Sequence, residues 1–144
     1  PTIITQFIKG GKNPKIKIGN INTSRDFVYV NDNINGIIEI MNSKKTIGRV
    51  INIATQKCFS IKECIKIISN YSKKKPKLTI DKKRLRRAEV FKLRGSNNNI
   101  KRLTNWSPKY STKDGFKKAL IETYEWFSKR ENLKNYSNFD KYNI

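Results

Sequence analysis

The sequence contains no histidine and only two cysteines, Cys58 and Cys64, among its 144 residues. A structural zinc site needs four nitrogen or sulfur ligands in a recognisable spacing, so we expect no metal centre. Carboxylates are also few, with 11 Asp and Glu in all. Because nucleophilic and general-base catalysis usually needs a histidine or a carboxylate beside the reacting group, the composition argues against a self-contained catalytic centre.

The chain also lacks a charged and apolar leader, and no apolar run approaches the roughly 18 residues of a membrane-spanning helix. It begins at Pro1 without an initiator methionine. We therefore expect part of a longer cytoplasmic protein that does not contact a membrane. In such a reducing compartment, Cys64 is predicted to be a small buried apolar residue, and no disulfide with Cys58 is expected.

Positive charge is what the chain has in excess, with 32 Lys and Arg and a formal net charge of +21. Dense cations are typical of nucleic-acid binding, because they release counterions from a phosphate backbone. The lysines are nevertheless spread over every segment, and Lys, Asn and Ile are used together in excess, as AT-rich codons would produce. We favour a biased surface, with a basic nucleic-acid-binding module as the alternative.

Hydrophobic periodicity and capping residues predict a mixed α/β fold of short strands and about five helices in one domain, followed by a polar tail over 129–144. Helices are expected at 2–8, 32–41, 60–71, 97–105 and 111–127, and strands at 15–18, 27–30, 50–54 and 77–80. Asp32 is predicted to cap its helix. The run 50–54 is almost wholly apolar, which is typical of a strand covered on both faces, as in a parallel sheet.

Asn52 is the polar exception inside that run. An amide buried in a strand must find hydrogen-bonding partners or cost a few kcal/mol, on the order of its desolvation penalty. A satisfied amide, or one at the open end of the strand, is as good an interpretation as contact with a ligand.

Arginines in two loops suggest anion binding. Arg25 and Asp26 precede one predicted strand, and Arg84, Arg86 and Arg87 lie in a second, irregular loop. A guanidinium group grips phosphate through paired N–H donors, which the ammonium of lysine does less specifically. Two such loops on one domain would suit a diphosphate.

An ordered series of motifs resembles the C-terminal half of the extended short-chain dehydrogenase/reductases that act on nucleotide sugars. The resemblance covers residues 1–128 and is strongest to the NAD-dependent 4,6-dehydratases of nucleotide-linked N-acetyl amino sugars in legionaminic-type pathways, with 4-epimerases as the alternative. The motifs are Lys17-Ile18-Gly19, Arg25-Asp26-Phe27-Val28-Tyr29-Val30, Ile47-Gly48-Arg49-Val50-Ile51-Asn52-Ile53, Arg84-Leu85-Arg86, Glu89-Val90-Phe91-Lys92-Leu93 and Asn105-Trp106-Ser107-Pro108.

This resemblance implies a Rossmann-type enzyme whose dinucleotide-binding domain lies upstream of Pro1. That domain would hold most of the NAD contacts and the catalytic Tyr-x-x-x-Lys pair, so no catalytic residue is expected in this chain, which alone would be inactive. The full enzyme would be a homodimer that oxidises C4 of the hexose, eliminates water across C5 and C6 and returns the hydride to C6. Residues 1–128 would be the part that binds the nucleotide-diphosphate sugar.

The resemblance also assigns the binding residues. Arg25 would contact the nucleotide or its phosphates, Asn52 would face the nucleotide sugar, and the loop with Arg84 and Arg86 would close over the diphosphate. Asp26, which would orient Arg25, and Glu89 would be supporting residues. Compared with the family pattern, the loop before Glu89 is about two residues short and lacks a proline and a serine, which leaves open which arginine binds phosphate; Ala54 replaces a glycine and Ser96 an aspartate.

Overall fold

The computed structural model describes residues 2–85 and 88–136, which form two compact units. Unit 1 is made of Pro1–Asn22, Ile61–Glu89 and Leu120–Ile144, and unit 2 of Thr23–Ser60 and Val90–Ala119. Both units are therefore discontinuous in sequence. Among the described residues, no helix combines the length and the apolar character needed to cross a bilayer.

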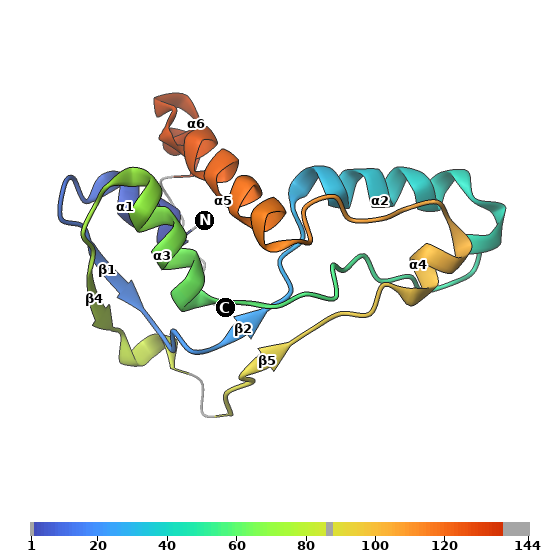
Figure 1. The fold of residues 1–144 in the computed structure, drawn as a ribbon, viewed down its shortest axis with the longest axis horizontal. Coiled ribbons are helices and arrows are strands. Elements are labelled where there is room, and N and C mark those ends of the chain that lie inside the picture. The colour runs from blue at the N-terminus through green and yellow to red at the C-terminus, as the bar shows by residue number, and fades with distance from the viewer. Residues whose placement is uncertain (1, 86–87, 137–144) are drawn as a thin grey trace. The chain divides into compact units, whose positions relative to one another are not determined.

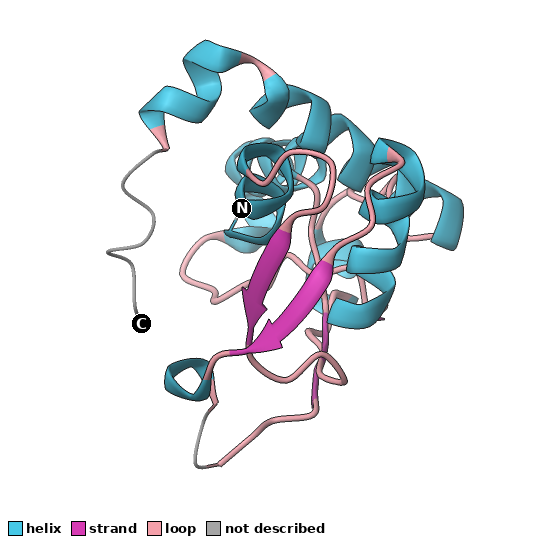
Figure 2. Cartoon of the chain, turned by 90° about the vertical axis from the view of Figure 1, so that its left-hand side faces the viewer, coloured by secondary structure: helices cyan, strands magenta, loops and turns pink. Residues whose placement is uncertain are grey.

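Unit 1 is built on a pair of parallel strands, which Figure 2 shows side by side. Strand β1 (Lys15–Ile18) pairs with β4 (Lys77–Ile80), in a register that sets Lys15 opposite Lys77. The remaining elements of this unit are α1 (Thr2–Lys9), α3 (Ile61–Ser72), the 3-10 turn η2 (Lys82–Arg84), the second half of α5 (Lys113–Ser128) and α6 (Arg130–Asn135).

The core of unit 1 is aliphatic and aromatic. In β1 exposed lysines alternate with buried isoleucines, because successive side chains of a strand point to opposite faces. The buried isoleucines meet apolar residues of the helices, and the core cluster consists of Ile4, Phe7, Ile16, Ile18, Ile65, Ile68 and Phe127. Cys64 is also buried, as predicted, and burial, with Glu63 adding a smaller effect, raises the pKa of its thiol to about 12.

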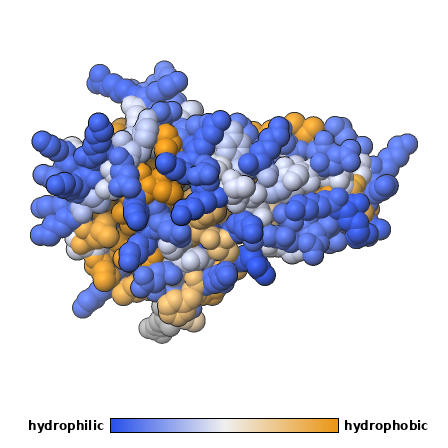
Figure 3. Space-filling view, in the orientation of Figure 1, coloured by the Kyte–Doolittle hydropathy of each residue, from blue (hydrophilic) through white to orange (hydrophobic). Residues whose placement is uncertain are grey.

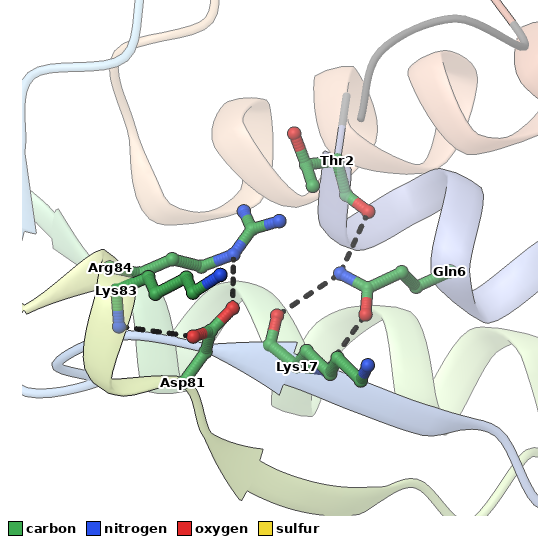
Figure 4. Close-up of polar contacts among 6 residues, drawn as sticks. All are labelled: Thr2, Gln6, Lys17, Asp81, Lys83 and Arg84. Carbon is green, nitrogen blue, oxygen red and sulfur yellow. Dashed lines mark hydrogen bonds and ion pairs between the residues drawn. The ribbon is translucent and has the colours of Figure 1, made fainter. Parts of the chain in front are cut away.

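Two polar side chains of unit 1 hydrogen-bond to its backbone, at the edge of β1 and just after β4 (Figure 4). The side-chain amide of Gln6 in α1 pairs with the backbone of β1: the Lys17 amide donates to Oε1 at 2.7 Å, and Nε2 donates to the Lys17 carbonyl at 3.2 Å. Beyond β4, the Asp81 carboxylate accepts from the Lys83 amide at 3.1 Å and caps η2.

Unit 2 contains a small three-stranded sheet and two helices of its own (Figure 1). In the order β3-β2-β5, the central strand β2 (Ser24–Arg25) runs antiparallel to β3 (Phe59–Ser60) and parallel to β5 (Lys92–Leu93). The rest of the unit comprises α2 (Val30–Asn42), the 3-10 turn η1 (Lys44–Thr46), α4 (Asn98–Leu103) and the first half of α5.

Aromatic stacking organises the interior of unit 2. The ring of Phe116 from α5 stacks on Phe59 of β3 with centroids 3.9 Å apart, and lies 5.6 Å from the ring of Phe27. Phe127, further along α5, is buried in unit 1, so aromatic side chains of this helix serve packing in both units. Aromatic pairs in favourable geometry stabilise by about 0.5–1.5 kcal/mol beyond their buried area.

The prediction that Asp32 caps a helix is wrong. Helix α2 begins two residues earlier, at Val30, after Tyr29, which makes no side-chain cap. Asp32 is instead 1% exposed, and its carboxylate accepts the amides of Lys109 at 3.0 Å and Tyr110 at 2.9 Å. The carboxylate of Asp32 therefore binds a loop far away in the sequence. The residues around Asp32 carry no signal of this contact.

Two predicted strands are absent from the described residues. The strand expected at 27–30 is replaced by β2, which is two residues long and ends at Arg25. The apolar run 50–54 has no regular secondary structure and pairs with no strand. At the other end of the chain, the first part of the stretch expected to be a polar tail forms α6 over Arg130–Asn135, and residues 137–144 of that stretch lie outside the described residues. Tyr136 after that helix packs edge-on against Phe127, with ring centroids 5.1 Å apart.

Candidate functional site

A pocket of about 270 Å³ lies wholly within unit 2. Two arginines, Arg25 and Arg94, line it together with the carboxylate of Asp26. Its apolar walls come from side chains on three separate segments, Val28, Ile53 and Leu93. A small hollow with two guanidinium groups and apolar walls has the character of an anion-binding site.

Asp26 holds the loops that form the pocket. Its Oδ1 accepts from the amide of Thr55 at 2.9 Å and from the Thr55 hydroxyl at 2.5 Å. Its Oδ2 accepts from the amides of Gln56 at 2.9 Å and Gly95 at 3.3 Å. Because one carboxylate satisfies donors from two distant segments, it fixes both pocket walls relative to β2. That Asp26 also orients Arg25 stays a prediction.

The loop held by Asp26 is locally strained and tightly packed. Gln56 has φ = 61°, in the left-handed region that favours glycine, and its Nε2 donates to Asn98 Oδ1 at 2.7 Å. On the opposite wall, a Cβ added at Gly95 would lie 2.5 Å from the Cβ of Ala54. Any larger residue at position 95 would thus force the two walls apart.

Arg25 is positioned by backbone carbonyls. Its Nη1 donates to the carbonyl of Ser24 at 2.9 Å and to that of Val90 at 2.8 Å. The same region is tied together by the β2–β5 pairing, in which the Asp26 amide donates to the Leu93 carbonyl at 3.0 Å. These contacts hold the Arg25 side chain at the centre of the small sheet, and Arg25 is one of the residues that line the pocket.

Arg94 is the site residue that the sequence interpretation missed. It follows β5 directly, and the parallel pairing of Arg25 with Leu93 brings it to the same pocket as Arg25. Its position, immediately after an apolar strand-like run and before Gly95, was the available signal. The strand that positions Arg94, β5, could not be predicted because residues 81–96 have no regular pattern of apolar residues.

The other predicted binding residue of unit 2, Asn52, is exposed and does not line the pocket, although its neighbour Ile53 does. Behind the pocket wall lies a different amide, that of Asn97, which is fully buried. Its Nδ2 donates to the Ala54 carbonyl at 2.8 Å. Asn97 thus supports the wall from within.

The remaining predicted residues belong to unit 1 or lie outside the described residues. Arg84 is exposed, and its Nε pairs with Asp81 Oδ2 at 3.3 Å (Figure 4). Glu89 is half-buried in the same unit, and Arg86 lies outside the described residues. The convergence of Arg25 with the loop of Arg84 and Arg86 on one diphosphate stays a prediction.

Comparison with known proteins identifies the family. The model of the GDP-mannose 4,6 dehydratase family matches residues 1–119. Among curated relatives, the chain is 26% identical over 122 residues to GDP-6-deoxy-D-mannose reductase of Pseudomonas aeruginosa, covering 85% of this chain and 40% of the relative. It is 29% identical over 128 residues to GDP-mannose 4,6 dehydratase 1 of Arabidopsis thaliana, covering 88% and 35%.

Solved structures support the same fold. UDP-glucuronic acid 4-epimerase of Bacillus cereus, in complex with UDP-glucuronic acid and NAD, matches with a TM-score of 0.72 at 24% identity, over 94% of this chain and 39% of that protein. The chain therefore spans about 40% or less of the length of these relatives, in their C-terminal portion. The resemblance to Rossmann-type extended dehydrogenase/reductases is confirmed, and the chain belongs to the GDP-mannose 4,6 dehydratase family.

Proposed function

We propose that this chain is the substrate-binding part of a nucleotide-sugar-modifying enzyme, and that the pocket of unit 2 binds the diphosphate of the substrate. The observation that carries the proposal is the presence of two arginines, Arg25 and Arg94, in one small pocket. Guanidinium groups bind phosphate oxygens through charge-assisted, often bidentate hydrogen bonds.

The charge and size of the pocket support this assignment. The single carboxylate lining it, that of Asp26, already accepts four hydrogen bonds from its own loops, which offset its negative charge. Arg25 and Arg94 are thus the two cationic residues of the lining, and the one acidic residue is occupied by its own hydrogen bonds. A volume of about 270 Å³ suits a diphosphate better than a complete nucleotide sugar, since sites for drug-sized ligands begin at about 300 Å³.

NAD does not fit the residues of this chain. A dinucleotide site needs a glycine-rich turn between a strand and a helix, and the described residues provide none at such a junction. We assign the cofactor to the portion of the relatives that this chain does not cover. In this proposal the chain binds and orients the substrate, and the redox chemistry takes place elsewhere in the enzyme.

For the reaction of the complete enzyme, we propose 4,6-dehydration of a nucleotide-linked hexose, with a nucleotide-linked N-acetyl amino sugar of a legionaminic-type pathway as substrate. The family match favours dehydration, whereas the likeness to a UDP-glucuronic acid 4-epimerase keeps 4-epimerisation as the second candidate. Both reactions need the same diphosphate anchor, so the role of the pocket does not depend on the choice.

The test is calorimetric titration of the chain with GDP-mannose, GDP and mannose. Binding of the two diphosphates but not of the free sugar is expected. Arg94→Ala should weaken binding about 10- to 100-fold, the range for one lost charge-assisted contact of roughly 1.5–3 kcal/mol. Arg25→Lys tests the second arginine while keeping its charge, because a complete truncation would also free the carbonyls of Ser24 and Val90.

Arg49→Ala is the matched control, because Arg49 is an exposed arginine of unit 2 that does not line the pocket. It should bind as the wild type does. Equal affinity of wild type and Arg94→Ala would overturn the site. A duplex DNA titration addresses the alternative: tight binding that falls steeply with salt, without any diphosphate binding, would favour a nucleic-acid module.

A further inference from the structure

Strand β4 is an open edge of the small sheet in unit 1. Among the described residues, its one strand neighbour is β1. The amides of Lys77 and Asp81 donate toward β1, to carbonyls at or next to its two ends, at 2.9 and 2.8 Å. Because backbone groups alternate in direction along a strand, the N–H and C=O groups of Leu78 and Ile80 point to the opposite side. These groups form an edge to which another strand can add.

The open edge of β4 is short and apolar. Leu78 is 40% exposed and Ile80 is 68% exposed. Figure 3 shows hydrophobic surface among hydrophilic side chains at the lower left, where Figure 1 draws β4. Pro76, which has no N–H donor, precedes the strand, and η2 begins at Lys82. A partner strand must therefore pair with Leu78 and Ile80 without extending far beyond them.

The sequence of this edge is complementary to itself in the antiparallel direction. From Lys77 to Asp81 it reads cation, apolar residue, threonine, apolar residue, carboxylate. When two copies align with Thr79 opposite Thr79, Leu78 lies opposite Ile80 of the second copy, and Lys77 lies opposite its Asp81. Leu78 and Ile80 carry the outward backbone groups, so each such pair can exchange both N–H···O bonds. Opposite charges and apolar side chains that face each other across two strands stabilise the pairing further.

The neighbouring registers are less favourable. With Leu78 opposite Leu78, Ile80 would face Pro76, which has no N–H to donate, and the charge pair would be lost. With Ile80 opposite Ile80, Leu78 would face Lys82, which lies in η2 and not in a strand. The register centred on Thr79 is thus the one that satisfies the backbone groups and the charges together.

We propose that β4 is an interaction edge for a second copy of this chain, which pairs with it in the antiparallel direction about Thr79. The complementarity of the edge to itself identifies the occupant, because a second copy supplies both the apolar and the charged counterparts. The side chain of Asp81 is 26% exposed, so it is accessible to Lys77 of the second copy while it caps η2. The contact lies in unit 1 and does not depend on the proposed diphosphate pocket of unit 2.

Disulfide cross-linking of the full chain tests the register. A non-hydrogen-bonded antiparallel pair has its Cα atoms about 4.5 Å apart, which a disulfide can span, so Thr79→Cys should form a cross-linked dimer on oxidation with diamide. Lys17→Cys is the matched control, because Lys17 is exposed and lies opposite Thr79 in β1. The Lys17 Cα atoms of two paired copies would lie about 14 Å apart, three strand spacings, which is beyond the reach of a disulfide.

Both substitutions are made together with Cys58→Ser, which removes the half-buried native thiol, while Cys64 is buried. Cross-linking of Thr79→Cys should be at least about tenfold faster than that of Lys17→Cys, because the two distances differ so widely. Equal rates, or no cross-linked dimer of Thr79→Cys, would overturn the proposal.

Sedimentation equilibrium tests the charge pairs. Lys77→Glu places a carboxylate opposite Asp81 at both ends of the paired strands, and it should weaken self-association about 2- to 30-fold, the range for two cross-strand pairs. Lys66→Glu, at an exposed position of α3, changes the net charge equally and should not weaken association. A wild-type chain that stays monomeric, or equal weakening by the two substitutions, would show that β4 is not the interaction edge.

Discussion

The interior of unit 1 and the interior of unit 2 are stabilised by different kinds of contact. Unit 1 buries a continuous aliphatic and aromatic cluster, whereas unit 2 is joined by carboxylates and amides that hydrogen-bond to distant backbone. Among the described residues, five of the six buried polar side chains belong to unit 2, as do ten of the fifteen large apolar side chains that are exposed. Unit 1 is thus organised around one continuous apolar cluster, and unit 2 around stacked aromatic rings together with buried polar groups that fix its loops.

Folding and binding thus depend on different kinds of contact in the two units. Apolar burial is non-directional and stabilises by the area removed from water, so it suits a unit that has only to hold its shape. Buried carboxylates are directional, and they fix the positions of particular loops at the cost of desolvation. Such loops are where a pocket can be built.

The substitution Phe7→Ala in unit 1 should cause the largest loss of stability. Phe7 is fully buried in the core cluster, and truncation of such a residue should lower the free energy of unfolding by about 3–5 kcal/mol. Urea unfolding followed by circular dichroism measures the change. Ile80→Ala, at a 68% exposed position of the same unit, is the control and should cost far less. Equal costs would mean that the cluster is not the core.

In unit 2, Asp32→Ala should have the next largest effect. It removes the acceptor of the amides of Lys109 and Tyr110, and unmade buried hydrogen bonds of this kind cost roughly 1–3 kcal/mol. Asp114→Ala, at an exposed position in the first turn of α5, provides the control and should change stability by no more than a few tenths of a kcal/mol. A cost for Asp32→Ala as small as that of the control would show that apolar packing, and not the polar contacts, holds unit 2.

The smallest expected effect is the pH dependence of stability caused by Cys64, which tests the burial of this residue in unit 1. The pKa of this thiol rises from 9.0 to about 12 on folding, so the unfolded chain loses its proton first as the pH increases. The contribution of the protonated Cys64 thiol to the free energy of unfolding is therefore complete below pH 9 and is lost as the pH rises from 9 to 12. At pH 10 about 1 kcal/mol of this contribution is lost. The stability difference between wild type and Cys64→Ala should therefore shrink by that amount between pH 8 and pH 10. A constant difference would mean that Cys64 is not buried as described.

The sequence predicts unit 1 well because its elements carry local signals. The alternation in β1, the period of α3 and the proline after it place strand, helix and strand within a residue or two. The one comparable local signal in unit 2 is Thr112, whose hydroxyl accepts from the Gly115 amide at 3.0 Å and marks the start of α5. Where stability comes from neighbouring residues in the sequence, local patterns suffice.

Unit 2 is predicted less well, because its residues are placed by contacts between distant segments. Asp32 has the sequence signature of a helix cap but binds a loop 77 residues away, and Arg94 reaches Arg25 only through a two-residue strand pairing. The run 50–54 has the signature of a buried strand, yet the partner strands of such a sheet are not in this unit. Residue chemistry pointed to Arg25 and Asp26 before the family resemblance assigned them roles, whereas Arg94 was found only from the fold.

The Gln6 amide on the edge of β1 has a consequence for aggregation. By hydrogen-bonding both backbone groups of Lys17, it occupies the place where a foreign strand would add. A two-stranded sheet blocked on one side can be extended only along β4, so two molecules joined through their β4 edges would leave no site for a third. Aggregation through this sheet would therefore end at dimers. Replacing Gln6 with a residue that cannot hydrogen-bond to the backbone of Lys17 would leave both edges free and would allow fibres to form.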